Sequence, residues 1–171
     1  MEQGLEFEQF ASSRAHRLFQ VAYLMCGDWH QAQDLVQTTL AKMFSVWGRL
    51  QRGGGDDGPT IDAYARKVLL RNYLSQKRLR KSSEIVTTDL PEQSSAPSDG
   101  GELRLVMVAA LKQLPPRNRA VVVLRYLEDH SIEAVADMLG ISPGAVKSLN
   151  FRSLAKLREI LGEDREALFQ R

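Results

Sequence analysis

Two helical patterns separated by one tight turn occupy residues 131–160 and constrain the fold more than any other stretch of the chain. Ser131 suits the cap of the first helix, and Gly140 suits its end, because glycine adopts the left-handed C-terminal cap at little cost. Between them, four apolar residues recur at helical spacing: Ile132, Val135, Ala136 and Leu139. Ser142 and Pro143 then suit the cap and the first position of a second helix. The pattern predicts two helices joined at a fixed angle.

The second of these helices has two faces of different chemistry. At 100° per residue, one face collects Val146, Ser153, Leu154, Leu157 and Ile160. The opposite face collects Gly144, Lys147, Ser148, Phe151, Arg152 and Ala155. Small, polar and cationic groups on a helix that follows a tight turn are typical of a helix-turn-helix that enters the DNA major groove. The alternative is a plain α-helical hairpin within a bundle.

Charge is unevenly distributed along the 171 residues, although the net charge is only +2. Residues 41–81 carry ten Lys or Arg against three acids, and residues 82–102 carry five acids and no base. Residues 112–171 carry ten bases against eight acids. This distribution predicts two modules that face nucleic acid, separated by an acidic spacer.

Composition argues against several other classes of protein. No run approaches the roughly 20 apolar residues of a membrane span, and the first residues lack the order of a signal peptide, so we expect a cytoplasmic protein without membrane insertion. Cys26 and His30 supply only two of the four ligands of a structural zinc site. No nucleophile, metal or nucleotide-binding constellation is evident, so we expect neither an enzyme nor a cofactor.

The N-terminal half predicts helices over residues 5–25, 29–48 and 60–80, with a glycine-rich loop over 48–60. The middle helix has the most regular apolar stripe: Ala32, Leu35, Val36, Thr39, Leu40, Met43, Phe44 and Trp47. Its other face carries Gln33, Asp34, Gln37, Thr38 and Ser45. That face is either solvated or a docking surface, and periodicity does not distinguish the two.

The helix predicted for 60–80 is rich in cations. Its inward stripe contains Ile61, Tyr64, Ala65, Val68 and Leu69. We expect six cations outward or at its end: Arg66, Lys67, Arg71, Lys77, Arg78 and Arg80. Beside Tyr64 and Tyr73, these cations suit a surface that contacts phosphates and stacks bases, and the alternative is an ordinary solvated face.

Residues 82–101 have the composition of a linker. We therefore expect an all-α protein with two small helical domains, 1–81 and 102–171, joined by a flexible acidic linker. Fully extended, such a linker spans on the order of 70 Å. In the second domain the pattern predicts helices over 102–113 and 116–128. The latter contains the run Val121–Leu124, which has strand propensity but helical flanks.

Several short motifs also resemble those of a known family. They are Asp34-Leu-Val-Gln37, Leu114-Pro115, Val122-Val-Leu-Arg125 and Leu139-Gly-Ile-Ser-Pro-Gly-Ala-Val-Lys-Ser148. With them the chain resembles the extracytoplasmic-function (group 4) sigma factors, the smallest bacterial transcription initiation factors. The resemblance covers about residues 7–81 and 103–160.

The resemblance implies a function for each part of the chain. Domain 1–81 would be sigma region 2, which binds RNA polymerase core and recognises and melts the minus-ten element, and 102–171 would be region 4, which reads the minus-thirty-five element. The linker would follow the RNA exit path. The implied partners are promoter DNA and the clamp coiled coil and flap of the polymerase, while an anti-sigma factor stays an open question.

The implied site residues fall into three groups. Asp34, Leu35 and Gln37 would dock on the polymerase. Arg66, Lys67, Arg71 and Asn72 would contact the minus-ten element. Ser142, Lys147, Ser148, Phe151 and Arg152 would contact the minus-thirty-five element, where Arg152 suits a guanine or a phosphate and Phe151 suits a thymine methyl or a sugar.

Two positions depart from the family pattern. Arg71 stands where the family often has an asparagine near a flipped minus-ten base, with Asn72 one place on. Asn150 falls on the apolar stripe of the second helix of the pair, so we expect either a hydrogen bond within the domain or a slightly rotated helix.

Three other kinds of protein compete with this interpretation. One is a response regulator or other helix-turn-helix regulator that is not an initiation factor, although residues 1–81 lack the alternating strands of a receiver domain. Another is a sigma-like protein that binds polymerase without recognising a promoter. An enzyme is the third and is the least supported.

Overall fold

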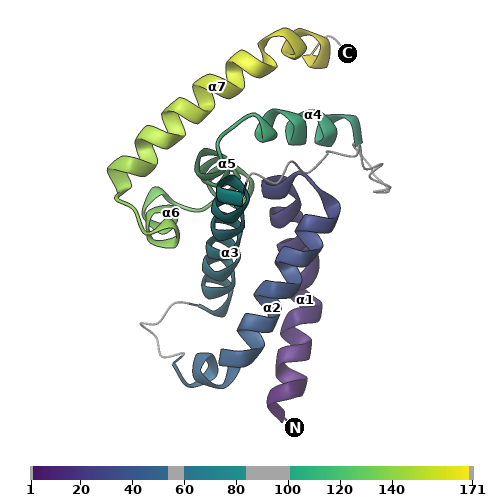
Figure 1. Cartoon of the computed structure of the whole chain (residues 1–171), viewed down its shortest axis with the longest axis vertical. Coiled ribbons are helices and arrows are strands. Elements are labelled where there is room, and N and C mark those ends of the chain that lie inside the picture. Colours follow the sequence, from purple (N-terminus) through teal and green to yellow (C-terminus); the bar gives the residue numbers. More distant parts are fainter. Residues whose placement is uncertain (1, 54–59, 84–100, 170–171) are drawn as a thin grey trace. The chain divides into compact units, whose positions relative to one another are not determined.

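The described part of the chain is helical and contains no strand, as predicted (Figure 1). The structure is a computed structural model that describes residues 2–53, 60–83 and 101–169. The elements are α1 (Glu2–Cys26), α2 (Trp29–Arg52), α3 (Ile61–Ser83), α4 (Gly101–Lys112), α5 (Pro116–Val122), a π-helical turn η1 (Val123–Leu127), α6 (Ile132–Leu139) and α7 (Pro143–Phe169). The chain divides into two compact units, Met1–Glu84 and Ile85–Arg171. The expected linker, 82–101, lies mostly outside the described residues.

In the first unit, α2 packs against both α1 and α3. Gly27 ends α1 with a φ of 68°, and Asp28 caps α2 by accepting a 2.8 Å hydrogen bond from the amide of Gln31. The predicted break between the first helix, 5–25, and the second, 29–48, is therefore confirmed. The largest fully buried side chains of this unit are Leu18, Met25, Leu35, Met43, Leu69, Leu70 and Tyr73.

The second helix is longer than its pattern predicted, because it continues to Arg52 rather than ending at residue 48. Gly48 is tolerated inside it, and Arg52 Nε donates a 3.1 Å hydrogen bond to the Gly48 carbonyl. The Gln51 amide donates to the Glu6 carboxylate, which ties the last turn of α2 to α1. Gly53 then caps the helix, and its amide bonds the Arg49 carbonyl at 2.9 Å. Residues 54–59 of the expected loop lie outside the described residues.

In the second unit, α7 packs against α4, α5 and α6. Val121–Leu124 is buried and helical, as predicted, but the expected single helix over 116–128 changes character at residue 123. There the chain forms a π-helical turn, in which the Glu128 amide bonds the Val123 carbonyl at 3.1 Å. Asp129 then adopts a left-handed φ of 55°, and the His130 amide bonds the Leu124 carbonyl at 2.9 Å.

Arg119 joins α5 to the end of α4. Its side chain is only 6% exposed. Nε donates to the Leu111 carbonyl at 2.7 Å, and Nη2 donates to the carbonyls of Lys112 and Leu114 at 3.1 and 3.0 Å. These carbonyls lie at or just after the C-terminal end of α4, where carbonyl groups lack intrahelical donors. A cation is favoured at such a helix end. Sequence analysis did not single out this residue.

No helix within the described ranges combines the length and apolar character needed to cross a membrane. Within the same ranges, no group of three or more His, Cys, Asp or Glu side chains is arranged to hold a metal ion.

Candidate nucleic-acid and polymerase interfaces

The turn between α6 and α7 has the hydrogen bonds that its sequence predicts. Ser131 Oγ accepts from the Ala134 amide at 3.0 Å, and Ser142 Oγ accepts from the Ala145 amide at 3.1 Å. Gly140 has a φ of 67°, in the left-handed region that favours glycine. Helix α7 therefore begins directly after a short turn whose backbone is fixed by these caps. The turn sets the direction of α7 relative to α6.

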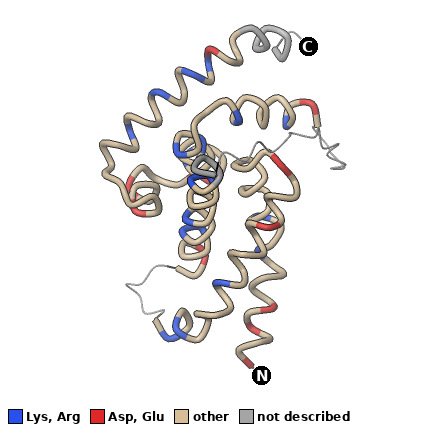
Figure 2. The backbone as a smooth tube through the Cα atoms, viewed as in Figure 1, with Lys and Arg blue, Asp and Glu red and all other residues tan. Residues whose placement is uncertain are grey.

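The two faces of α7 also agree with the prediction. Val146, Ser153 and Leu157 are buried, while Leu154 and Ile160 are half-buried. The opposite face is exposed throughout: Gly144, Lys147, Ser148, Phe151, Arg152 and Ala155. We call the four central residues of that face, Lys147, Ser148, Phe151 and Arg152, the α7 face. In Figure 2, blue Lys and Arg segments recur along α7.

The α7 face has an apolar centre and cationic edges. Phe151 is 76% exposed, which is unusual for so large an apolar side chain. Arg152 is also exposed, and its Nε makes only a long 3.4 Å contact with the Ser148 carbonyl. Its guanidinium therefore keeps donors that can form a bidentate pair with a base edge or a phosphate.

Asn150 resolves the alternative that its position left open. Its Nδ2 donates a 2.9 Å hydrogen bond to Tyr126 Oη, so the amide pairs within the domain. Tyr126 lies in the π-helical turn, and the Arg125 guanidinium carbon lies 5.6 Å from the centre of its ring.

The exposed face of α2 carries the polar residues expected to dock on polymerase. Asp34 and Gln37 are exposed, as predicted. Leu35 is 0% exposed and belongs to the core, so the expectation that it touches a partner is wrong. Leu35 belongs to the apolar stripe that faces the core, whereas Asp34 and Gln37 face away from it. Leu35 can support the docking face only from beneath.

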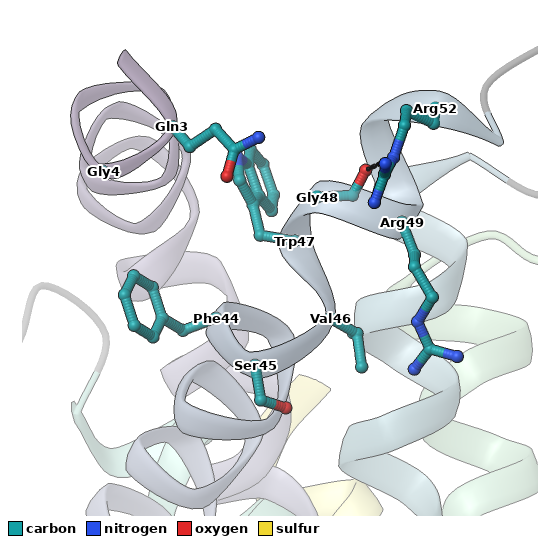
Figure 3. A pocket seen from close by; sticks show the side chains of 9 residues that line it. All are labelled: Gln3, Gly4, Phe44, Ser45, Val46, Trp47, Gly48, Arg49 and Arg52. Carbon is teal, nitrogen blue, oxygen red and sulfur yellow. Dashed lines mark hydrogen bonds between the residues drawn. The ribbon is translucent and has the colours of Figure 1, made fainter. Parts of the chain in front are cut away.

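Phe44 is a second departure on α2, because this member of the expected core stripe is 60% exposed. Its ring lies 5.2 Å from that of Phe7 on α1, and the ring of Trp47 lies 5.3 Å from Phe7, in each case measured between centroids. These rings adjoin a groove of about 540 Å³ between the first turn of α1 and the last turns of α2 (Figure 3). The groove is lined by Gln3, Gly4, Phe44, Ser45, Val46, Trp47, Gly48, Arg49 and Arg52. The sequence pattern did not indicate it, because its residues come from opposite ends of two helices.

The cationic helix α3 differs from its prediction at two positions. Arg66 is only 6% exposed, so its expected outward orientation is wrong. Tyr73 is buried and cannot stack on a base, and Lys77 Nζ lies 6.0 Å from its ring centre. The burial of Arg66 and Tyr73 has one cause. Because α3 contacts α1 as well as α2, more of its circumference is buried than the single apolar stripe predicted.

Three other residues proposed for the minus-ten element remain accessible. Arg71 is exposed, whereas Lys67 and Asn72 are half-buried. Near the start of the same helix, Asp62 pairs with Arg14 of α1 through contacts of 2.7 Å (Nε to Oδ1) and 3.3 Å (Nη2 to Oδ2). The hydrogen bond and the charge of Asp62 raise the pKa of Arg14. The pair holds the start of α3 against α1.

Comparison with known proteins agrees with these features. Residues 110–159 match the family described as Sigma-70, region 4. The RNA polymerase sigma-E factor of Streptomyces coelicolor is 39% identical over 164 residues, which cover 94% of this chain and 89% of that protein. The RNA polymerase sigma factor CarQ of Myxococcus xanthus is 34% identical over 160 residues, covering 92% and 90%.

Two solved structures share the fold. The sigma factor RpoE from Bartonella quintana, crystallised in complex with the anti-sigma factor NepR, has a TM-score of 0.73 at 24% identity and covers 92% of this chain and 97% of its own. CnrH, solved in complex with the cytosolic domain of CnrY, has a TM-score of 0.66 at 22% identity, with coverage of 92% and 88%.

A capped helix pair with an exposed, cationic second helix defines a helix-turn-helix DNA-binding protein. The similarity to the sigma factors above identifies the family within this class. The chain belongs to the extracytoplasmic-function family of RNA polymerase sigma factors. It binds RNA polymerase and promoter DNA and directs transcription initiation, by binding and not by catalysis. The alternative of a regulator that is not an initiation factor is thereby excluded.

Proposed function

We propose that the two units divide promoter recognition between them. The C-terminal unit, 102–171, reads the minus-thirty-five element through the α7 face, with Ser142 and the start of α7 against a phosphate. The observation that supports this most directly is the α7 face itself. All four of its residues are exposed, while the opposite side of the same helix is buried or half-buried. The α7 face is therefore not needed for packing within the unit and is available to contact DNA.

We further propose that the N-terminal unit, 1–81, binds core polymerase and the minus-ten element. Asp34 and Gln37 contact the clamp coiled coil, and their exposure beside the buried Leu35 supports this role. Lys67, Arg71 and Asn72 contact the minus-ten DNA. Arg66 is left out of this set because its side chain is buried.

Transcription reconstituted from purified core polymerase and this chain tests the proposal as a whole. On a library of promoters randomised at both elements, the chain should select a preferred sequence at each one. The variant Arg152→Ala should change selection at the upstream element only, and Arg71→Ala should affect binding at the downstream element only. If both variants changed both elements equally, the division between units would be wrong.

A protein partner that inhibits the chain is a separate proposal. RpoE of Bartonella quintana was crystallised with the anti-sigma factor NepR, and we propose that a protein of that class also binds this chain. Such a partner should compete with core polymerase for the exposed face of α2 that contains Asp34 and Gln37. The test is competition: adding a candidate partner should release the chain from core polymerase, and simultaneous binding of both would contradict the proposal.

A further inference from the structure

Asn150 is an unexpected residue for its position on α7. It occupies the buried side of the helix, four residues after Val146 and seven before Leu157, both of which are buried. An apolar residue there would extend the stripe without a polar group to satisfy. Asn150 Nδ2 instead bonds Tyr126 Oη at 2.9 Å, while its Oδ1 is buried and accepts no hydrogen bond from the described residues. The fold therefore tolerates a half-satisfied amide at this position.

The partner of Asn150 is held by a rigid piece of backbone. Tyr126 belongs to the π-helical turn Val123–Leu127, and π-helical turns within helices are frequently found at functional sites. Arg125, which stacks near the Tyr126 ring, also donates from Nη1 to the His130 carbonyl at 2.8 Å and so closes the turn. The Tyr126 hydroxyl is thus a fixed point against which α7 can be oriented.

Asn150 is half-buried and Tyr126 is 46% exposed, so their hydrogen bond lies at the edge of the apolar seam. A polar residue on such a seam can set the register of one helix on another. Asn150 is next to Phe151 in sequence and one turn from Lys147, so the orientation of its amide is coupled directly to that of the α7 face. Side chains extend about 5–6 Å from a helix axis, so a rotation of roughly 20° displaces their ends by about 2 Å. That displacement exceeds the range of about 0.5 Å over which an N–H···O hydrogen bond keeps its geometry.

We propose that Tyr126 and Asn150 are positioning residues that fix the rotation of α7 and thereby sharpen discrimination among minus-thirty-five elements. The inference rests on the proposed function of the α7 face. Neither residue needs to touch DNA for this role.

The experiment uses the full chain with core polymerase and a promoter library randomised at the minus-thirty-five element. Tyr126→Phe removes one hydroxyl, and Asn150→Leu restores the apolar stripe. Each should reduce discrimination between the best element and its single-base variants by about three- to tenfold, a range set by the net contribution of one hydrogen bond. The double variant should lose no more than either single variant, because both remove the same interaction.

Stability separates positioning from simple support of the fold. Asn150→Leu should keep or raise the unfolding midpoint while discrimination falls, whereas a residue that only supports the fold would move both in the same direction. The helical circular dichroism and the salt dependence of binding should stay unchanged in Tyr126→Phe. If the parent chain discriminates among elements and both variants discriminate as well as the parent, the positioning role is wrong. If the parent shows no preference among elements, the proposed function fails instead.

Discussion

Arg119 Nε lies 2.7 Å from the carbonyl oxygen of Leu111, and the same guanidinium donates to the carbonyls of Lys112, the last residue of α4, and of Leu114. One buried side chain thus supplies donors to three acceptors at a helix terminus. It connects α4 to α5, and α5 in turn packs against α7.

We therefore predict that Arg119→Ala destabilises the C-terminal unit by about 2–4 kcal/mol, because the carbonyls lose charged donors while buried. Arg119→Lys should recover only part of this loss, since an ammonium cannot reproduce the planar fork. Amide hydrogen exchange at Val121–Leu124 measures the effect within this unit. Arg117→Ala is the matched control, because Arg117 is exposed on the same helix and should change stability by less than about 0.5 kcal/mol. Equal exchange in the two variants would contradict the capping role.

The docking face of α2 gives a second prediction. Replacing Asp34 and Gln37 together with lysine should weaken binding to core polymerase at least tenfold and leave the melting temperature nearly unchanged, because both side chains are exposed. Leu35→Ala should do the reverse and lower stability by about 2–5 kcal/mol, because it opens a cavity in the core. Binding titrations beside thermal melts measure both. Undiminished affinity in the double variant would show that polymerase binds elsewhere.

Capping residues and the two faces of α7 were predictable from the sequence. Ser131, Gly140 and Ser142 act through atoms a few residues away, so local spacing was sufficient to place them. The buried side of α7 followed from periodicity for the same reason. Asn150 was recognised as an exception, but its partner is 24 residues earlier in the chain, beyond the reach of any helical period.

The residues whose positions were predicted wrongly or missed each have a different structural cause. Arg66 is buried because α3 packs on two helices, and an apolar stripe predicts burial against only one. Phe44 is exposed although it keeps the rhythm of its stripe, because it lies toward the end of α2 beside the groove. Arg119 was missed because a cation in a sequence usually indicates an exposed side chain, and only the fold brings the helix-end carbonyls of Leu111, Lys112 and Leu114 within its reach.

Arg66 and Arg71 were both expected to contact DNA, but Arg66 is buried and Arg71 is exposed. Arg71→Ala should reduce the slope of log affinity for promoter DNA against log salt concentration by about one unit, as expected for one lost phosphate contact. Its melting temperature should stay near that of the parent. Arg66→Ala should instead lower the melting temperature, because it removes a buried side chain. If Arg71→Ala left the salt slope unaltered, this part of α3 would be a solvated face.

Arg152 carries the sharpest prediction about sequence recognition. If its exposed guanidinium forms a bidentate contact with a base, Arg152→Ala should cost about 1–3 kcal/mol of binding and relax discrimination at one or two adjacent positions of the minus-thirty-five element. A contact with phosphate alone would weaken all sequences almost equally. Selection from a randomised element distinguishes the two outcomes, because only the first changes the preferred sequence.

Two further substitutions on α7 separate loss of contact from loss of fold. Phe151→Ala should leave stability within about 0.5 kcal/mol of the parent, because the ring is exposed, and should still weaken promoter binding. Leu157→Ala should destabilise the unit by roughly 2–5 kcal/mol and lose binding through unfolding. Leu154 would make a poorer control, because it is only half-buried and leaves a smaller cavity. If Arg152→Ala and Phe151→Ala both bind and discriminate like the parent, while Ala155→Glu also has no effect, then the α7 face does not enter the major groove.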